Sequence, residues 1–565
     1  MKCAPLRLRI FTFLLILASP ARPAPAAESG STATLRGLIL IPKDVFDPSV
    51  PGEDKWLFRL ADKIHINTRQ EIIRRELLLY PGEPWSLDLA KESERNLREF
   101  SFIKSARIRP VNRTPESFDL EVLTQDSWTL APEFVFGTRG GEHISGVGLL
   151  EKNLLGYGKT ISLLNERVGK DTNNTIQYID PRVLNSHVRF SVIGGNIKDG
   201  SELGVLLEHP FFALQTPFAG FISGTNLQKE GKLYDKAQET SNYIHGHDVA
   251  EAGAAMRVNR RSSVIQRIGG SLSYERNYFK PKAGTLPGTL PQNRVLSGPS
   301  LIFRWLVPRY IEETFINKVE RVEDFNLGNE GEASLGYSAT AFGSSRDWLT
   351  FSLQDQHGIS LGEGKFAMAR LGFKGRADRQ LRNTLFHGSA NLYWKFPTRW
   401  PQTWILHAEG TYGINLDGEN QQLVGGENGL RGYKVHSLSG NKTMLFNVEH
   451  RFYLPHEFLH LGYIGGALFF DAGIAEPNKK LMTLRDFKTD VGFGLRGGPT
   501  RSSLGLVGRA DIAYALNGPP GGGGRWVLSV LLGHAFGTSN SIAQDFLKGP
   551  TRSLREDPDA PRLEQ

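Results

Sequence analysis

The sequence predicts an all-β transmembrane barrel of about 16 antiparallel strands, preceded by one small α+β module. Three observations lead to this prediction. The chain opens like an exported protein, its single cysteine is Cys3, and from about residue 130 many segments of about ten residues alternate apolar and polar side chains between polar turns. After the first residues no run of eighteen apolar residues occurs, which argues against helical membrane spans.

The segment "MKCAPLRLRIFTFLLILASPARPAPAAES" predicts a cleavable signal peptide over residues 1–27. It has a basic start, an apolar core and small residues near Ala27. Cleavage after Ala27 removes four basic residues and no acidic residue, so the net charge falls from +8 to +4. That charge is too small for this length to indicate nucleic-acid binding. Without a cysteine the exported chain forms no disulfide, so core packing or a closed sheet must stabilise it.

Residues 62–128 predict a small mixed domain, with an extra strand and linker over residues 28–61. "DKIHINT" indicates a strand, and Thr68 with Glu71 has the capping-box pattern of a helix start. Ser86 begins a second helix, and "KSARIRPV" and "SFDLEVLTQ" are strands joined by a polar turn. An exposed edge of such a sheet can pair with an extended client peptide, and a spacer domain without a ligand is the alternative.

Residues 129–536 contain the predicted barrel. In "TMLFNVEHRFYL", Met444 and Phe446 lie on an apolar face, and Asn447 and Glu449 on a largely polar one. A soluble sandwich alternates in the same way, but the signal peptide, the missing cysteines and the number of segments favour a membrane barrel. Close to twenty candidate strands are present. At about 25 residues per strand with its loop, the region suits 16, with the other segments as projecting hairpins.

The segment "LVGGENGLRGYKVHSLSGN" is a long glycine-rich connection between two predicted strands. Arg431 lies in it between Gly429 and Gly432. An arginine that enters a confined lumen needs anionic partners. Period-two alternation directs Glu449 and Asp471 to the inside of the predicted barrel, so these two carboxylates are the expected partners.

The ordered fragments "GLRGY", "NVEHRFYL", "FFDAG" and "VGFGLR" resemble the BamA/TamA-type outer-membrane assembly and translocation superfamily, the bacterial surface antigen barrels. The module resembles a POTRA domain through "LYPGEPWS", "NLREFSFIKSARI" and "DLEVLTQDSW". The resemblance implies a 16-strand barrel in the outer membrane of a Gram-negative cell, with the POTRA-like domain in the periplasm. Only one such module is evident and a polar, disordered tail over residues 537–565 follows the barrel, which leaves the clients open.

The resemblance also implies two sites. An extracellular loop would fold into the lumen, where a latch would pin it; its residues are Gly429, Arg431, Gly432, Tyr433, Glu449 and Asp471. The first and last strands, at about 130–137 and 525–536, would pair weakly as a seam, with Gly533 and Phe536 near its end and Gly533 weakening the pairing.

The function implied by the resemblance is insertion or assembly of outer-membrane proteins, or their translocation across the outer membrane. The expected partners are unfolded outer-membrane or secreted client proteins, outer-membrane lipid and accessory lipoproteins, with no nucleic acid, cofactor or metal and no enzymatic activity. A passive pore or surface adhesin with the same fold is the alternative.

Several fragments match enzyme or metal motifs. "HEFLH", His456 to His460, fits the zinc pattern HExxH, but it lies between two predicted strands, where a turn is favoured over the helix that zinc binding requires. "GISLG" and "GYGKT" lack the helix that a nucleophile elbow or a phosphate loop needs. His245 and His247 are interpreted as solvated loop residues, with metal binding as the alternative.

Overall fold

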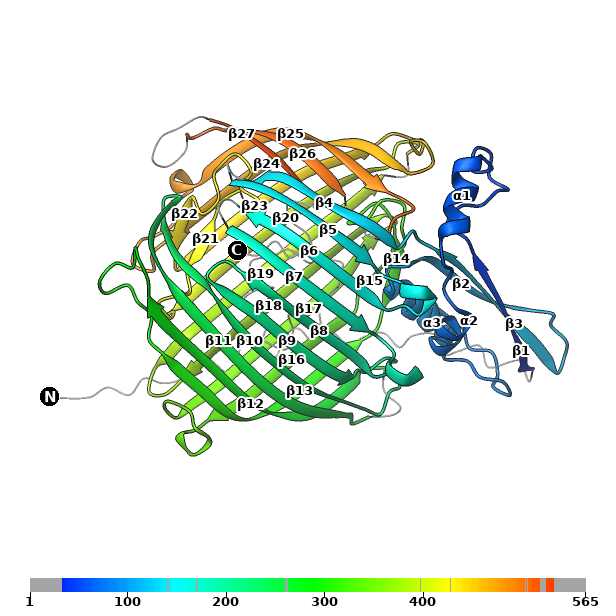
Figure 1. The fold of residues 1–565 in the computed structure, drawn as a ribbon, viewed down its shortest axis with the longest axis horizontal. Helices are drawn as coiled ribbons and strands as arrows, with labels where there is room; N and C mark the ends of the chain where they lie inside the picture. The colour runs from blue at the N-terminus through cyan, green and yellow to red at the C-terminus, as the bar shows by residue number, and fades with distance from the viewer. Residues whose placement is uncertain are drawn as a thin grey trace.

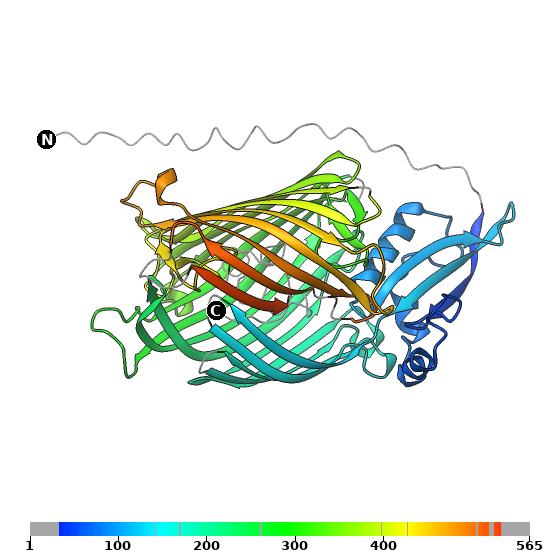
Figure 2. The ribbon, with the colours of Figure 1, turned by 90° about the horizontal axis from the view of Figure 1, so that it is seen from above.

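The computed structural model describes residues 33–139, 142–168, 171–259, 263–396, 398–426, 428–503, 505, 507–518 and 525–532. It contains an N-terminal unit, residues 33–128, set against one end of a β-barrel that starts at Leu130 (Figures 1 and 2). We call this end of the barrel the near end and the opposite end the far end. The predicted signal peptide and tail lie outside the described residues. Among the helices of the described ranges, none has the length and apolarity needed to span a membrane.

The N-terminal unit contains three helices and a three-stranded sheet. Its elements are β1 Thr34–Lys43, α1 Trp56–Ile64, α2 Gln70–Arg75, α3 Leu87–Glu99, β2 Ile103–Val111 and β3 Ser117–Asp126. The strand order is β1-β3-β2, with β1 parallel and β2 antiparallel to β3, and α2 and α3 pack against the sheet. The prediction of two helices followed by two strands is confirmed by α2, α3, β2 and β3. Ser86 caps α3, because its hydroxyl accepts a hydrogen bond from the Leu89 backbone N–H at 3.3 Å.

The start of this unit differs from the prediction. The strand expected at "DKIHINT" is wrong, because Asp62 to Ile64 form the last turn of α1. Trp56, Leu60 and Ile64 recur every four residues, which is the spacing of one helix face. The strand β1 within the expected linker is an integral part of the sheet. Thr68 does not cap α2; its backbone N–H and hydroxyl donate hydrogen bonds to the Asp126 carboxylate at 2.6 and 2.9 Å.

The barrel closes from 20 antiparallel strands among the described residues. In chain order they are β4 Leu130–Arg139, β5 Glu142–Glu151, β6 Thr160–Val168, β7 Asp171–Asp180, β8 Arg189–Ile197, β9 Gly200–His209, β10 Phe218–Asp235, β11 Gln238–Arg257, β12 Ile265–Pro281, β13 Arg294–Val307, β16 Asn329–Ser338, β17 Trp348–Gly362, β18 Lys365–Ala377, β19 Leu381–Phe396, β20 Gln402–Ile414, β23 Lys442–Tyr453, β24 Gly462–Glu476, β25 Lys488–Pro499, β26 Gly508–Ala515 and β27 Trp526–Leu532. Two small hairpins lie outside the wall: β14 Tyr310–Glu313 with β15 Glu323–Asn326, and β21 Gln422–Val424 with β22 Leu438–Gly440.

The predicted count of 16 strands is therefore wrong, although the barrel itself is confirmed. The connections are shorter than assumed: two residues join β17 to β18 and three join β18 to β19. One strand with its loop uses about 20 residues on average rather than 25. Most of the segments interpreted as projecting hairpins are consequently wall strands.

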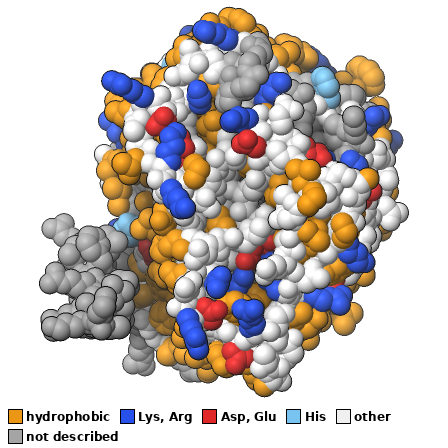
Figure 3. All heavy atoms as spheres, turned by 90° about the vertical axis from the view of Figure 1, so that its left-hand side faces the viewer, with side chains coloured by type: hydrophobic (Ala, Val, Ile, Leu, Met, Phe, Trp, Pro, Cys, Tyr) orange, Lys and Arg blue, Asp and Glu red, His pale blue; other side chains and the backbone are white. Residues whose placement is uncertain are grey.

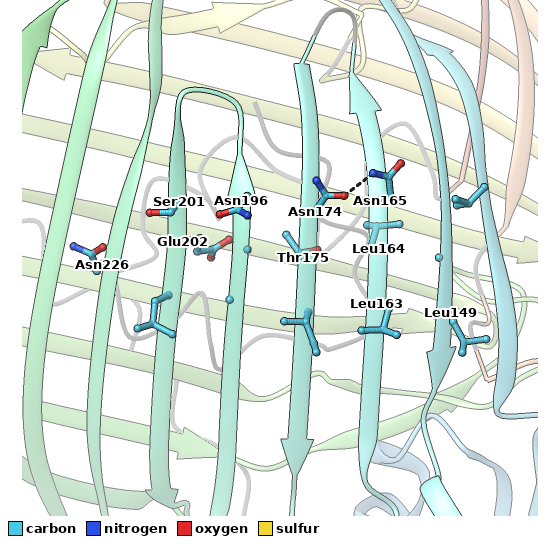
Figure 4. Close-up of a pocket in the computed structure, with 16 residues that line it drawn as sticks. Leu149, Leu163, Leu164, Asn165, Asn174, Thr175, Asn196, Ser201, Glu202 and Asn226 are labelled. Atoms are coloured by element: carbon cyan, nitrogen blue, oxygen red, sulfur yellow. Dashed lines mark hydrogen bonds between the residues drawn. The ribbon is translucent and has the colours of Figure 1, made fainter.

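The outer face of the wall carries exposed apolar side chains that extend over different lengths of the strands. On β20 they run from Trp404 through Leu406 to Tyr412. On β7, exposed Ile176 is followed toward the far end by exposed Asn174, which bonds the Asn165 amide of β6 at 2.5 Å (Figure 4). The far end itself shows basic and acidic side chains spread among polar surface, with hydrophobic side chains gathered around its circumference (Figure 3). Exposed apolar side chains thus extend over a longer part of β20 than of β7.

The N-terminal unit docks on the near-end turns through buried polar contacts. Arg182, in the β7–β8 turn, bonds both carboxylate oxygens of buried Glu76 at 2.7 and 2.6 Å. The Leu214 backbone N–H, in the β9–β10 turn, donates to Glu92 of α3 at 2.5 Å. These contacts fix the unit to the barrel end, because breaking a buried charge-assisted pair is costly.

The connection between β13 and β16, residues 308–328, forms a segment that we call the near-end hairpin. On one side Arg321 donates to the backbone carbonyls of Ser101 and Ile103 at 2.8 and 2.7 Å. On the other side Ile316, Phe325 and Leu327 pack against inward-facing residues of β18, β19 and β20, namely Phe366, Met368, Tyr393 and Ile405. The near-end hairpin thus occupies the mouth of the barrel beneath the N-terminal unit.

Candidate functional site: the lumen charge cluster and the seam

The connection between β20 and β23, residues 415–441, folds back into the barrel. Its stem is the β21–β22 hairpin, and Leu430 and Tyr433 beyond it are fully buried against Val424 and Leu445. Gly429 has a φ of +112°, a conformation that side-chain-bearing residues rarely adopt. The Tyr433 hydroxyl donates to the Thr489 carbonyl at 3.1 Å. The apolar residues of the loop tip therefore bury themselves inside the wall rather than in a separate domain.

Arg431 at the loop tip meets both carboxylates expected from the sequence. Its Nε and Nη2 bond the two oxygens of Asp471 at 2.8 Å each, and its Nη1 bonds Glu449. Its guanidinium lies 3.5 Å from the ring centroid of Phe469. The side chains of Arg431, Glu449 and Asp471 are at most 1% exposed. Bidentate charge-assisted pairing is the geometry in which a buried arginine is best stabilised.

The ion pairs continue beyond these three residues into a larger group. Glu449 also bonds Arg451 at 2.6 Å and Arg496 at 3.4 Å. Arg496 pairs with Asp511 at 2.5 Å, and Asp511 pairs with Arg509 at 3.0 Å. We call this group the lumen charge cluster: Arg431, Glu449, Arg451, Asp471, Arg496, Arg509 and Asp511, all buried. Each of its four arginines and three acidic residues belongs to at least one ion pair, and pairing is what buried charges require in a low-dielectric site.

Gly432 explains how the loop approaches the wall so closely. A Cβ atom on Gly432 would lie 2.5 Å from the Cβ of Asp490, so any larger residue would displace the loop or the strand. The Asn447 side-chain amide also binds this turn, because it donates hydrogen bonds to the Gly429 carbonyl at 2.6 Å and to the Asp471 carboxylate at 2.7 Å. All six residues predicted for the latch are therefore brought to one place.

The lumen charge cluster is linked to the near end through Arg451. Its Nη1 donates to the Ile316 carbonyl of the near-end hairpin at 2.8 Å. The same hairpin binds the N-terminal unit through Arg321, so a series of direct contacts connects the N-terminal unit to the loop tip. The sequence reasoning missed this hairpin, because its two four-residue strands are too short for a clear alternation.

The closure between the last strand and the first is short. Among the described residues, β27 and β4 are paired at one position, Val530 with Thr138. The neighbouring pair β26–β27 extends over seven positions and β4–β5 over ten. Gly533 and Phe536, expected near the seam, lie outside the described residues.

The enzyme-like fragments lie in strands and turns. "HEFLH" forms the β23–β24 turn, as predicted. Glu457 and His460 lie with Glu53 in a group whose ligand atoms are within 4.8 Å of one another. Arg501 already pairs with Glu53 at 2.5 Å and with Glu457 at 3.2 Å, which supplies the positive charge there.

The other fragments follow the same pattern. "GISLG" is the end of β17 before the turn to β18, and "GYGKT" leads from a short turn into β6. The loop assignment of His245 and His247 is wrong, because both lie on β11; they bond Asn277 and Glu275 of β12 at 2.9 and 3.2 Å. In β11, glycine and charged residues interrupt the alternation of apolar and polar side chains that would indicate a strand.

Comparison with known protein families shows the family to which the chain belongs. Residues 153–536 match the Omp85 superfamily domain. The chain belongs to the Omp85 superfamily. Its members are outer-membrane barrel proteins of Gram-negative bacteria that act in protein assembly or translocation, so the chain is placed in that broad class. A search of curated proteins finds no match.

Two solved structures resemble the Omp85 chain described here at low identity. CdiB from Acinetobacter baumannii is 12% identical with a TM-score of 0.45, over 89% of this chain and 74% of that chain. BamA from Haemophilus ducreyi lacking POTRA domains 1-3 is 13% identical with a TM-score of 0.37, over 90% of this chain and 86% of that chain. These values describe a distant likeness.

The members of the lumen charge cluster that were not assigned to the site have a visible sequence signal. In "GRADIAYA", Arg509 and Asp511 alternate with apolar neighbours and share a face with Ala513. The same period-two rule that directs Glu449 inward applies to them. The pairing of Asp511 with Arg496 on β25 depends on strand order, which a single sequence does not provide.

Proposed function

We propose that this Omp85 protein assists insertion and assembly of outer-membrane proteins, and that clients use the β27–β4 seam. The observation that carries the proposal is the single residue pair joining β27 to β4 among the described residues. Each lost ladder position removes backbone hydrogen bonds between the strands. With one pair among the described residues, this junction should open at a lower cost than the seven-position junction beside it.

The short exposed apolar surface of β6 and β7 supports the same route. These strands lie two and three positions from β4 in the sheet. A bilayer beside a short apolar surface thins locally, at a modest cost per ångström of mismatch. A thin bilayer next to the seam lowers the barrier for a client strand to pass from the barrel edge into lipid.

The lumen is the less favourable route. The near-end hairpin occupies its mouth, and the 415–441 loop is bound inside it by the lumen charge cluster. Passage through the lumen would require release of several buried ion pairs. We therefore assign the cluster a structural role, which is to hold the loop and keep the wall strands β23 to β26 in register.

The N-terminal unit is proposed to be a POTRA-like domain in the periplasm that receives unfolded clients. Its sheet has two edges, β1 and β2, and β1 carries the exposed side chains of Ile39 and Ile41. An exposed edge can accept an extended strand through backbone hydrogen bonds. The contacts of Arg321 and Arg451 connect the N-terminal unit to the loop tip, so that client binding to the unit can shift the position of the tip.

A disulfide across the seam tests the proposal. We would make Thr138→Cys with Val530→Cys, and as a control Ala369→Cys with Ala390→Cys, a paired position between β18 and β19. The protein is reconstituted in proteoliposomes, and folding of an unfolded barrel client is followed by its heat-modifiable band. The seam-locked variant should lose client folding and regain it on reduction, whereas the control pair should remain active.

Three results would overturn parts of this proposal. Full client folding by the oxidised seam-locked variant would exclude the seam route. Transfer of a soluble client into the vesicle without barrel folding would favour translocation. A steady conductance with neither activity would favour the passive pore.

A further inference from the structure

Helix α1 presents one face to the protein and another to the surroundings. Phe58 is buried in a cluster with Val45 and Phe46. On a different face, Trp56, Leu60 and Ile64 follow one another at four-residue spacing and are 74%, 44% and 60% exposed. Leu57 beside them is 55% exposed. A nine-residue helix thus leaves four large apolar side chains uncovered, which is unusual for a surface that faces only water.

A row of basic side chains flanks this apolar face. Lys55, Arg59 and Lys63 are exposed and recur at the same four-residue spacing. Asp62 is the one acidic residue of the helix and is turned inward, accepting a hydrogen bond from the Phe46 backbone N–H at 3.2 Å. An apolar face bordered by Lys and Arg is typical of helices that lie in the interface of an anionic membrane.

The neighbouring β23–β24 turn extends the apolar surface toward the barrel wall. α1 is held to this turn by Phe58, whose ring centroid lies 6.3 Å from that of His460. Phe458 and Leu459 of the turn are 55% and 63% exposed, and Ile464 follows on the outer face of β24. Figure 1 shows α1 beside the near end, lying across the direction of the barrel rather than along it. The apolar surface therefore adjoins the outward-facing wall.

We propose that α1 and the β23–β24 turn form an interfacial anchor that inserts into the periplasmic leaflet of the outer membrane. The apolar side chains would enter the acyl boundary, and Lys55, Arg59 and Lys63 would contact the phosphates of anionic phospholipids. The inference rests on the proposed periplasmic placement of the N-terminal unit. Lipid is favoured over a protein partner because the surface adjoins the apolar wall and carries the complementary charge.

The anchor lies next to the start of the seam. Trp128, two residues before β4, exchanges backbone hydrogen bonds with the β25–β26 turn: its N–H donates to Arg501 at 2.6 Å, and its carbonyl accepts from Ser503 at 2.8 Å. Arg501 in turn pairs with Glu53, just before α1. An anchored α1 would therefore hold the N-terminal unit and the first residues of β4 at the membrane surface.

Site-specific fluorescence quenching tests the anchor in the full chain. Leu60→Cys is labelled with an environment-sensitive dye in vesicles of phosphatidylethanolamine and phosphatidylglycerol, with and without brominated lipid. Arg107→Cys, an exposed position on β2, is the control within the N-terminal unit, and Leu406→Cys, exposed on β20, is the control for the barrel wall. We expect brominated lipid to quench most of the fluorescence at positions 60 and 406 and little at position 107.

The outcomes separate the inference from the proposed function. Quenching at position 406 with none at position 60 would overturn the anchor and leave the outer-membrane barrel intact. Loss of quenching at both positions would contradict the membrane placement itself. Disulfide formation between two copies through Leu60→Cys would identify a second copy as the occupant and overturn the lipid proposal. Charge reversal of Lys55, Arg59 and Lys63 should weaken quenching at position 60 in anionic vesicles only.

Discussion

Replacing Arg431 with methionine should destabilise the folded barrel more than any surface substitution. Methionine keeps much of the aliphatic length of arginine and removes the charge. In the native protein Arg431 is the charged partner of Asp471, whereas Glu449 has Arg451 and Arg496 as well. The variant therefore leaves one buried carboxylate, Asp471, with the neutral Asn447 amide in place of its cation.

The size of the effect follows from burial. Arg431 and Asp471 are at most 1% exposed, so solvent screening offers little relief. Removing one partner of a buried pair costs about 3–5 kcal/mol. The double variant Arg431→Met with Asp471→Asn removes the uncompensated charge as well, and it should recover about 2 kcal/mol of that loss.

The assay is the urea dependence of the heat-modifiable folded band, measured in detergent for the single variants, the double variant and Arg399→Met. Arg399 is an exposed arginine in the β19–β20 turn, so its replacement should change the free energy of unfolding by less than about 0.5 kcal/mol. If Arg431→Met matches Arg399→Met, the lumen charge cluster does not stabilise the barrel and the reasoning fails.

Three further predictions follow from contacts elsewhere. Gly432→Ala should cost about 1–3 kcal/mol by overpacking against β25, whereas Gly497→Ala, with open space around its Cβ position, should be nearly neutral in the same urea titration. Arg321→Met should loosen the N-terminal unit and expose the linker between β3 and β4 to limited proteolysis, while leaving the heat-modifiable band unchanged. Burial pushes the pKa of Glu312 upward, but the charges of Arg98 and Lys91 outweigh it and the net pKa is lowered. Its contribution to docking is therefore present above the unfolded value of about 4.3 and is lost as the pH falls below it, so proteolysis of the linker should accelerate in acid; equal rates at pH 4 and 7 would contradict this.

Local patterns in the sequence predict the parts of the fold that depend on local chemistry. Ser86 marks the start of α3, and the alternation around Glu449 identifies both the strand and its inward face. The first two features depend on residues close in the chain. The interior position of Arg431 was predicted from the family resemblance together with the in-phase carboxylates Glu449 and Asp471.

The remaining features depend on long-range packing. The strand count needs the closing geometry of the whole sheet, which no segment contains. The near-end hairpin is fixed by contacts of Arg321 and Ile316 with residues more than a hundred positions away in sequence. The apolar face of helix α1 lies toward the surroundings, so its sequence pattern does not indicate a protein core.

The central claim is that clients enter the membrane through the seam. The most direct measurement is quantitative proteomics of the outer membrane and the medium after depletion of the protein, with wild type, Thr138→Cys alone or Thr138→Cys with Val530→Cys supplied back. The account predicts a broad fall in barrel proteins that wild type and the single variant reverse and the disulfide-locked pair does not. Unchanged barrel proteins with loss of a few exported proteins, or rescue by the locked pair, would contradict it.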